Sequence, residues 1–150
     1  SYDFDPTIDM DQTLDWYRER YQLLGGMDMV LHDVAIHDAA YMISSVRRLQ
    51  THKDVKAIAM ITHTVPAPWI IKHDMDLVDT WRFNSMGNKL MQYALTQDTE
   101  NKIHTWCFGH YHKPVDQLYQ GIRYVCNPRG RGNTPWKQSV FYPRRIEISL

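Results

Sequence analysis

The sequence IHTWCFGHYH, residues 103–112, is the clearest structural signal in the chain. Ile103 to Phe108 form a short apolar run with the length and composition of a buried strand. The run ends at Gly109, and two histidines, His110 and His112, follow it. Residues i and i+2 of an extended segment point to the same side, so we expect both imidazoles to face one site if the strand direction persists past Gly109.

A second apolar run ends in the same way. VKAIAMI, residues 55–61, predicts a strand that is buried on both faces, and His63 follows it directly before a loop with two prolines. In open α/β sheets ligands gather outside the carboxyl ends of the strands. Neutral imidazoles bind zinc, manganese or iron. The sequence therefore predicts a metal site made by His63, His110 and His112 at one edge of a sheet.

The other five of the eight histidines do not share this context. We interpret His52 and His104 as surface or loop residues. His32 and His37 are each followed by an aspartate and are interpreted as helix caps or as residues that hold a metal ligand in place. His73 lies in a loop that is expected to border the site.

Hydrophobic periodicity and turn residues predict helices and strands elsewhere in the chain. In chain order these are a helix from Asp9 to Gly25, a strand over 27–36, a helix that Asp38 caps and that ends near Thr51, a helix over 86–94, two strands over 115–119 and 122–127 joined by a Gln120-Gly121 turn, and a strand over 145–150. Early alternation and a β-rich end predict an α/β or α+β layered architecture. We expect a mixed sheet with flanking helices, in a single domain over 1–150.

Composition excludes several classes of protein. The chain has 150 residues, and its 17 basic and 17 acidic residues cancel, so nucleic-acid binding through a general positive charge is not indicated. No stretch reaches the ~18 apolar residues of a membrane span, and the first residues, SYDFDPTIDMDQ, are acidic where a signal peptide is basic. We expect a cytoplasmic protein with no membrane partner, in which Cys107 and Cys126 are packed free thiols.

Three motifs together resemble the calcineurin-like metallophosphoesterases. Residues 61–66 (ITHTVP) resemble the last histidine motif of that family, 109–112 (GHYH) its closing GHxH motif, and 124–130 (YVCNPRG) the asparagine-proline-arginine-glycine loop that follows. The order of the motifs agrees with the family, and the resemblance covers nearly all of this chain. It implies a layered α/β/β/α sandwich and hydrolysis of phosphomonoesters or phosphodiesters at two divalent metal ions, which are manganese, iron, zinc or nickel.

The resemblance also implies roles for single residues. It makes His63 and His110 ligands of one ion and His112 a ligand of the other. Arg129 is expected to contact phosphate oxygens of the substrate. Arg131, in the same loop, is expected either to do the same or to be a solvated turn residue.

The chain departs from the family in its amino-terminal motifs. It contains no aspartate-x-histidine triplet, no glycine-aspartate pair and no glycine-asparagine-histidine triplet, so it resembles only the carboxy-terminal half of the family domain. We expect either a truncated longer protein, which we favour, or a natural fragment that takes the missing ligands from a partner. The isolated chain should bind at most one ion and be inactive or nearly so, its catalytic residue is unknown, and an uncovered sheet face would favour homo-oligomers or association with the missing half.

Two other functions stay open at the level of the sequence. One is a non-catalytic binding or regulatory module that keeps the fold, and the other is a mononuclear zinc-binding domain in which three histidines and water hold the ion. The loop 67–83, with Trp69, Trp81 and Phe83, is expected either to shape a substrate pocket or to pack into the core. Neither the substrate nor the metal is fixed by these residues.

Overall fold

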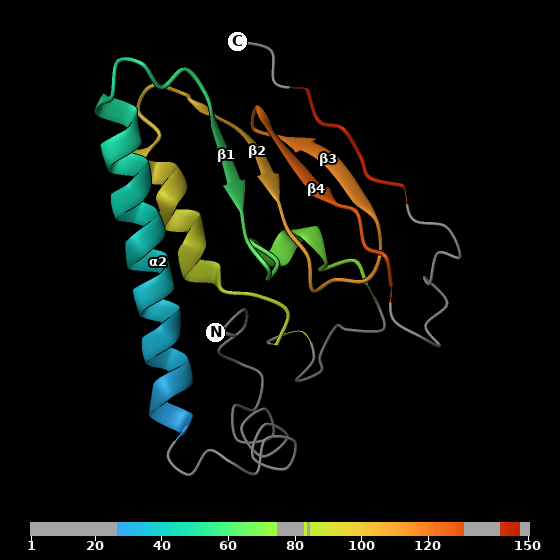
Figure 1. The fold of residues 1–150 in the computed structure, drawn as a ribbon. Helices are drawn as coiled ribbons and strands as arrows, with labels where there is room; N and C mark the ends of the chain where they lie inside the picture. The colour runs from blue at the N-terminus through green and yellow to red at the C-terminus, as the bar shows by residue number, and fades with distance from the viewer. Residues whose placement is uncertain (1–26, 75–82, 84, 131–141, 148–150) are drawn as a thin grey trace.

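The part of the chain that the structure describes has an α/β fold, in which a long α-helix and a 3₁₀ helix lie beside a four-stranded sheet (Figure 1). The structure is a computed structural model that describes residues 27–74, 83, 85–130 and 142–147, with the side chains of α2 described from Val34 onward. The elements in chain order are α2 (Met27–Thr51), β1 (Ile58–Ile61), the 3₁₀ helices η1 (Pro68–Ile70) and η2 (Lys89–Gln97), β2 (Ile103–Cys107), β3 (Val115–Tyr119) and β4 (Ile122–Cys126). The helix predicted from Asp9 lies outside these residues.

The sheet is mixed, as predicted, with the strand order β1-β2-β4-β3. Strands β1, β2 and β4 are parallel, and β3 runs antiparallel to β4 at the edge. The predicted hairpin is confirmed, because Gln120 and Gly121 join β3 to β4 with φ angles of 49° and 80°. Positive φ at both central residues is the mark of the two-residue turn that matches the twist of paired strands.

Helix α2 begins earlier in the chain than the sequence predicted. The strand expected over 27–36 is wrong, because α2 runs through it, and Asp38 lies inside the helix instead of capping it. The buried residues Ala35, Ala39 and Val46 recur at intervals of four and seven, which is the helical period. A short run of apolar residues fits both periods, which is why the segment resembled a strand. The predicted end at Thr51 is confirmed.

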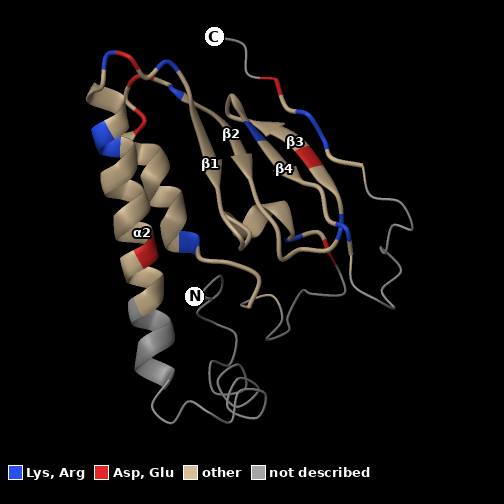
Figure 2. Cartoon of the chain, in the orientation of Figure 1, with Lys and Arg blue, Asp and Glu red and all other residues tan. Residues whose placement is uncertain are grey.

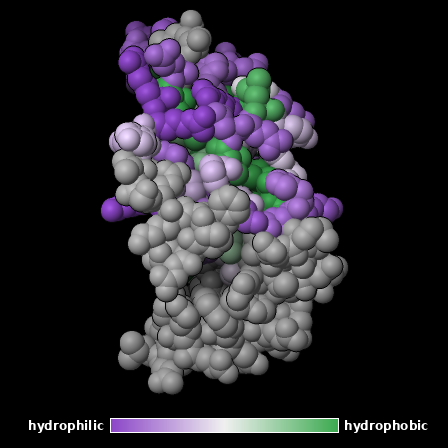
Figure 3. Space-filling model, turned by 90° about the vertical axis from the view of Figure 1, so that its right-hand side faces the viewer, coloured by the Kyte–Doolittle hydropathy of each residue, from purple (hydrophilic) through white to green (hydrophobic). Residues whose placement is uncertain are grey.

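Strand β1 is an edge strand, and the prediction that both of its faces are buried is wrong. Ile58 and Met60 are buried, whereas Ala59 is exposed and Ile61 is 77% exposed. The cross-strand register places Ile61 on the same face of the sheet as Leu118 of β3, which is 72% exposed. Figure 3 views the molecule from the side away from the helices and shows apolar residues at the surface between hydrophilic ones.

The opposite face of the sheet carries the core. Helices α2 and η2 pack against each other on this side (Figure 1). Trp106 of β2 is fully buried and stacks on Tyr124 of β4, with 6.2 Å between the ring centroids. Trp69 of η1 contacts Tyr124 and Tyr119 at centroid distances of 5.1 and 4.5 Å, so it packs against the sheet. Phe83 belongs to the same core, and Trp81 lies outside the described residues.

Helix η2 occupies most of the helix predicted over 86–94, but it is a 3₁₀ helix that begins at Lys89. Asn88 caps it: its side-chain oxygen accepts a hydrogen bond from the amide of Leu90 at 3.0 Å. Its side-chain nitrogen donates to the carbonyl of Ala35 in α2 at 2.9 Å. Asn88 is fully buried, so this one side chain sets both the start of η2 and its position against α2.

A polar network joins α2, η2 and β2 at the amino end of the parallel strands. The carboxylate of Asp98 accepts hydrogen bonds from Gln50 Nε2 (2.6 Å) and from the amides of Lys102 (2.8 Å) and Ile103 (3.0 Å). The ammonium of Lys102 donates to the carbonyl of Gln50 at 2.6 Å, in the last turn of α2, where a positive charge is favourable. Charged residues of both signs gather at this end of the sheet (Figure 2).

The carboxy-terminal segment corrects a further prediction. Residues 145–147 are not in a strand, and 148–150 lie outside the described part of the chain. The segment is held by side chains: Arg144 forms an ion pair with Asp116 of β3 at 2.8 Å, and Asn127 Nδ2 donates to the carbonyl of Tyr142 at 3.1 Å. In the described residues, no helix is long and apolar enough to cross a membrane.

Candidate functional site

The carboxyl ends of β1, β2 and β4 meet at one edge of the sheet, which is the lower edge in Figure 1. His63 follows β1, His110 follows β2 and Arg129 follows β4. Because parallel strands deliver their carboxyl ends to the same side, three segments far apart in the sequence are brought together here. We call this edge, with its following loops, the carboxyl edge.

Backbone hydrogen bonds continue past the strand ends and fix these segments together. The amide of Thr62 donates to the carbonyl of Cys107, and the amide of Gly109 donates to the carbonyl of His63, both at 3.0 Å. A Cβ atom at position 109 would lie 3.3 Å from the His63 carbonyl oxygen and 3.6 Å from His63 Nδ1. Gly109 therefore allows the close approach that puts the loop after β2 against His63.

This contact brings two of the predicted histidines together. The rings of His63 and His110 lie edge to face, with 5.2 Å between their centroids and 64° between their planes. His63 is exposed and His110 half-buried, so the pair stands at the surface. Imidazole nitrogens are common zinc ligands, so this contact brings together two side chains of the type that the predicted metal site requires.

The backbone at His110 is unusual. Its φ angle is 60°, and the amide of Tyr111 donates to the carbonyl of Gly109 at 2.6 Å, so the chain makes a tight turn centred on His110. A positive φ is strained for a residue with a side chain, and such strain clusters at functional sites. The turn also means that the strand direction does not persist past Gly109, so the condition on which His110 and His112 were expected to face one side of an extended segment is not met.

His112 is not grouped with the other two. It is half-buried in the loop between β2 and β3, and within the described residues no cluster of three or more histidine, cysteine, aspartate or glutamate side chains is arranged to hold a metal ion. The site therefore consists of one imidazole pair, with His112 two residues along the chain from His110. Metal binding by all three histidines stays a prediction.

The remaining histidines occur in different settings. His52 is exposed just after α2, as predicted, and its Nδ1 accepts a hydrogen bond from the amide of Asp54. His104 is half-buried within β2 instead of a loop, and His37 is exposed inside α2, so it is not a helix cap. His73 is exposed beside the buried Asp74, and the side chain of His32 is not described.

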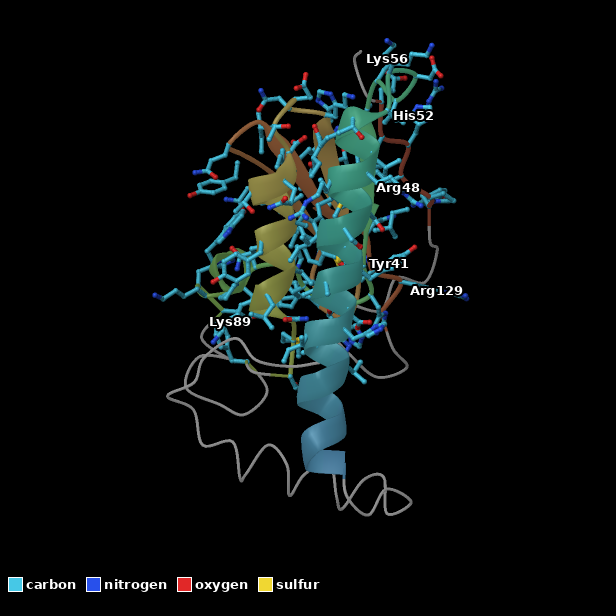
Figure 4. All side chains as sticks on the ribbon, turned by 90° about the vertical axis from the view of Figure 1, so that its left-hand side faces the viewer. Tyr41, Arg48, His52, Lys56, Lys89 and Arg129 are labelled. Carbon is cyan, nitrogen blue, oxygen red and sulfur yellow. The ribbon has the colours of Figure 1, made fainter. Side chains whose placement is uncertain are left out.

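Arg129 lies in the loop after β4, where its side chain is exposed. Figure 4 shows it directed outward, away from the helices. A guanidinium in this position is free of the core and can meet an anion that approaches the carboxyl edge. Arg131 lies outside the described residues.

Sequence analysis missed an acidic residue at this edge. Asp74 is buried, with 5% of its surface exposed, and it accepts a hydrogen bond from the hydroxyl of Tyr111 at 2.8 Å. The ammonium of Lys113 forms an ion pair with it at 2.7 Å. Both partners belong to the loop that carries His110 and His112. An aspartate three residues beyond an apolar pair, Ile70 and Ile71, was the available signal.

The two thiols are free, as predicted. Burial raises the pKa of Cys126 to about 12 and also raises the pKa of Cys107. The protonated Sγ of Cys126 donates to the carbonyl of Tyr111 at 3.0 Å, so this thiol helps to hold the histidine loop. Neither group is a thiolate near neutral pH, so neither is a ready nucleophile or metal ligand.

Comparison with known proteins gives no relative: no family model, no curated protein and no solved structure matches the chain.

Proposed function

We propose that this chain carries the metal-binding part of a metal-dependent phosphoesterase that hydrolyses phosphomonoesters or phosphodiesters. The observation that supports the proposal best is the pairing of His63 with His110, from two separate segments, at the carboxyl edge of parallel strands. The Gly109–His63 hydrogen bond holds the pair in place. The resemblance of the three motifs to the calcineurin-like family adds the reaction class.

The second face of the sheet, on which Thr105 and Val125 of the central strands are buried and only the edge strands are exposed, is consistent with the finer fold that this proposal implies. One face packs against α2 and η2, and the other exposes Ile61 and Leu118. A layered α/β/β/α sandwich requires each sheet to cover the inner face of the other. We therefore propose that this sheet is one inner layer of such a sandwich.

Each of the four candidate site residues has a role in the proposed reaction. His63 and His110 would hold one ion through their imidazoles, and His112 would contribute to the second. Divalent ions held by these residues would supply Lewis-acid chemistry, which polarises a phosphate ester and activates water as a nucleophile. Arg129 would bind a non-bridging phosphate oxygen and orient the ester. Because the aspartate motifs of the family are absent from this sequence, we expect little or no hydrolysis by the chain alone.

Titration of the purified chain with zinc and manganese, followed by calorimetry, tests the proposal. We expect one ion to bind, and His63→Ala and His110→Ala to weaken its binding at least tenfold. His52→Ala is the matched control, because His52 is exposed at the other end of the sheet. Absence of binding by the wild type, or equal binding by all variants, would contradict the proposal.

A mononuclear zinc-binding domain is the second candidate, because only one imidazole pair is assembled in the described residues. It differs from the first in what metal removal does. A structural zinc contributes directly to folding, so a chelator should then unfold the chain. For the phosphoesterase, a chelator should leave the circular dichroism spectrum unchanged. A non-catalytic module that keeps the fold would bind no metal at all.

A further inference from the structure

The Asp74 carboxylate is the most deeply buried acidic group at the carboxyl edge among the described residues. Its side chain is 4% exposed, and it lies just after η1. Oδ2 accepts from the hydroxyl of Tyr111 at 2.8 Å, while Lys113 Nζ lies 2.8 Å from Oδ1 and 2.7 Å from Oδ2. One carboxylate thus engages two side chains of the same short loop.

The positions of these two side chains matter. Tyr111 lies between His110 and His112 in the chain, and Lys113 follows His112. Tyr111 is further fixed through its backbone, since its amide donates to Gly109 and its carbonyl accepts from the thiol of Cys126. With residues 111 and 113 both attached to Asp74, little freedom is left for the histidines on either side of Tyr111.

Stability alone is a weak reason for this arrangement. Burying the Asp74 carboxylate costs free energy that its attraction to the half-buried Lys113 ammonium only partly returns, and apolar residues of the same volume often serve a fold better. What a buried carboxylate with charged and hydroxyl partners does provide is one defined geometry, because any other arrangement leaves its buried charge without compensation. The loop that receives this fixed geometry is the one that also contains the strained backbone at His110.

We propose that Asp74 is a positioning residue, whose buried carboxylate holds Tyr111 and Lys113 and thereby sets where the imidazoles of His110 and His112 lie. The effect on the loop stands by itself. Its consequence for metal affinity rests on the proposed function.

The test uses the whole chain, the three variants described next, and Lys113→Gln alone. Asp74→Asn removes the charge at constant shape, Tyr111→Phe removes one hydroxyl, and the double variant Asp74→Asn with Lys113→Gln removes both charges together. Asp116→Asn is the matched control, because Asp116 also pairs with a basic side chain, Arg123, but lies exposed on β3. The readouts are the imidazole NMR signals without metal, zinc affinity, and the midpoint of thermal unfolding.

In Asp74→Asn we expect the signals of His110 and His112 to shift and the zinc dissociation constant to rise about tenfold, as for other residues that orient metal ligands. Tyr111→Phe should give a smaller change of the same kind. The double variant should recover part of the wild-type signals, because it no longer leaves the Lys113 ammonium without its partner. Asp116→Asn should change neither histidine.

Unchanged imidazole signals in Asp74→Asn and Tyr111→Phe overturn the inference, even if the unfolding midpoint falls, since a purely structural role would lower only the midpoint. If Asp74→Asn does not fold, the imidazole NMR signals of His110 and His112 in Tyr111→Phe and Lys113→Gln decide whether the inference holds. A wild type that binds no zinc but whose variants shift the signals refutes the proposed function alone. A wild type that binds zinc, with variants that keep both affinity and signals, refutes the role of Asp74 alone.

Discussion

The two ends of the parallel strands are built in opposite ways. At the amino end, Asp98, Gln50 and Lys102 hydrogen-bond to one another and to backbone groups of α2 and β2. At the carboxyl edge, His110 has a strained backbone angle and Asp74 is a buried charge. The amino end satisfies the hydrogen-bonding groups where α2 ends and β2 begins. The carboxyl edge holds side chains in one geometry at a cost in the free energy of folding. This difference indicates that stability is concentrated at one end and candidate chemistry at the other.

Removal of Asp98 should have the largest effect on stability. Asp98→Ala leaves the amides of Lys102 and Ile103 and the side chain of Gln50 without their acceptor, so we expect the free energy of unfolding to fall by about 3 kcal/mol. Urea denaturation measures it. Metal affinity should not change, because the carboxyl edge is untouched. A loss of metal binding in a variant that still folds would show that the two ends are coupled.

A substitution at the carboxyl edge, His110→Asn, removes a candidate metal ligand and relieves backbone strain. His110→Asn should weaken zinc binding at least tenfold, which is about 1.4 kcal/mol. The free energy of unfolding should stay the same or rise by up to about 1 kcal/mol, because asparagine tolerates a positive φ better than histidine. His104→Asn, within β2, is the control: it should keep the zinc affinity and lower stability, since asparagine is disfavoured in strands. A His110→Asn protein much less stable than the wild type would contradict the assignment of strain.

High pH should loosen the carboxyl edge through Cys126. Burial raises the pKa of this thiol from 9.0 in the unfolded chain to about 12 in the folded protein. The unfolded chain therefore loses the proton first, so the contribution of the protonated thiol is complete below pH 9 and is lost between pH 9 and 12. We expect the free energy of unfolding to fall by about 1 kcal/mol from pH 8 to pH 10.

Urea unfolding at the two pH values measures this dependence in the wild type and in Cys126→Ala. The variant should show a flatter dependence on pH, with the remainder arising in part from Tyr124, whose pKa burial also raises to about 12. Cys107→Ala is the comparison, and it should change the dependence less because Cys107 is only half-buried. If the free energy of unfolding changes equally with pH in the wild type and in Cys126→Ala, this thiol is not the cause of the pH dependence.

The smallest expected effects are those of alanine substitutions at two glycines, Gly109 and Gly121. Gly109→Ala pushes a methyl group against the His63 carbonyl, so we expect a loss of about 0.5 kcal/mol and a shifted His63 imidazole NMR signal. Gly121→Ala meets open space at a φ of 80°, so it should cost about 1 kcal/mol through the backbone and leave His63 unchanged. A shift of the His63 signal in Gly121→Ala but not in Gly109→Ala would reverse the comparison.

Local signals were sufficient for much of the fold. The hairpin follows from Gln120-Gly121 between two β-like runs, and β2 from the apolar run that Gly109 ends. The proximity of His63 and His110 followed from one rule, that parallel strands bring their carboxyl ends to one edge. These features depend on residues that are close in sequence or on a general property of sheets.

Features that depend on tertiary neighbours could not be predicted in this way. The exposure of Ile61 depends on β1 being an edge strand, which its own sequence does not state. The turn at His110 and the burial of Asp74 both arise from contacts with distant segments. The start of α2 was misjudged for a different reason, because a short apolar run has no single period until the packing of Ala35 and Ala39 is known.

The hairpin turn has a consequence for the order of assembly. Strands β3 and β4 are joined by two residues and can pair within microseconds, whereas β1 and β2 are separated by both η1 and η2 and must close a long loop first. We therefore expect β1 to dock last. His63 travels with β1, so the imidazole pair is completed only at the end of folding. Zinc added during refolding should slow the undocking of β1 from β2. It should leave the rate of the early step, in which β3 pairs with β4, unchanged.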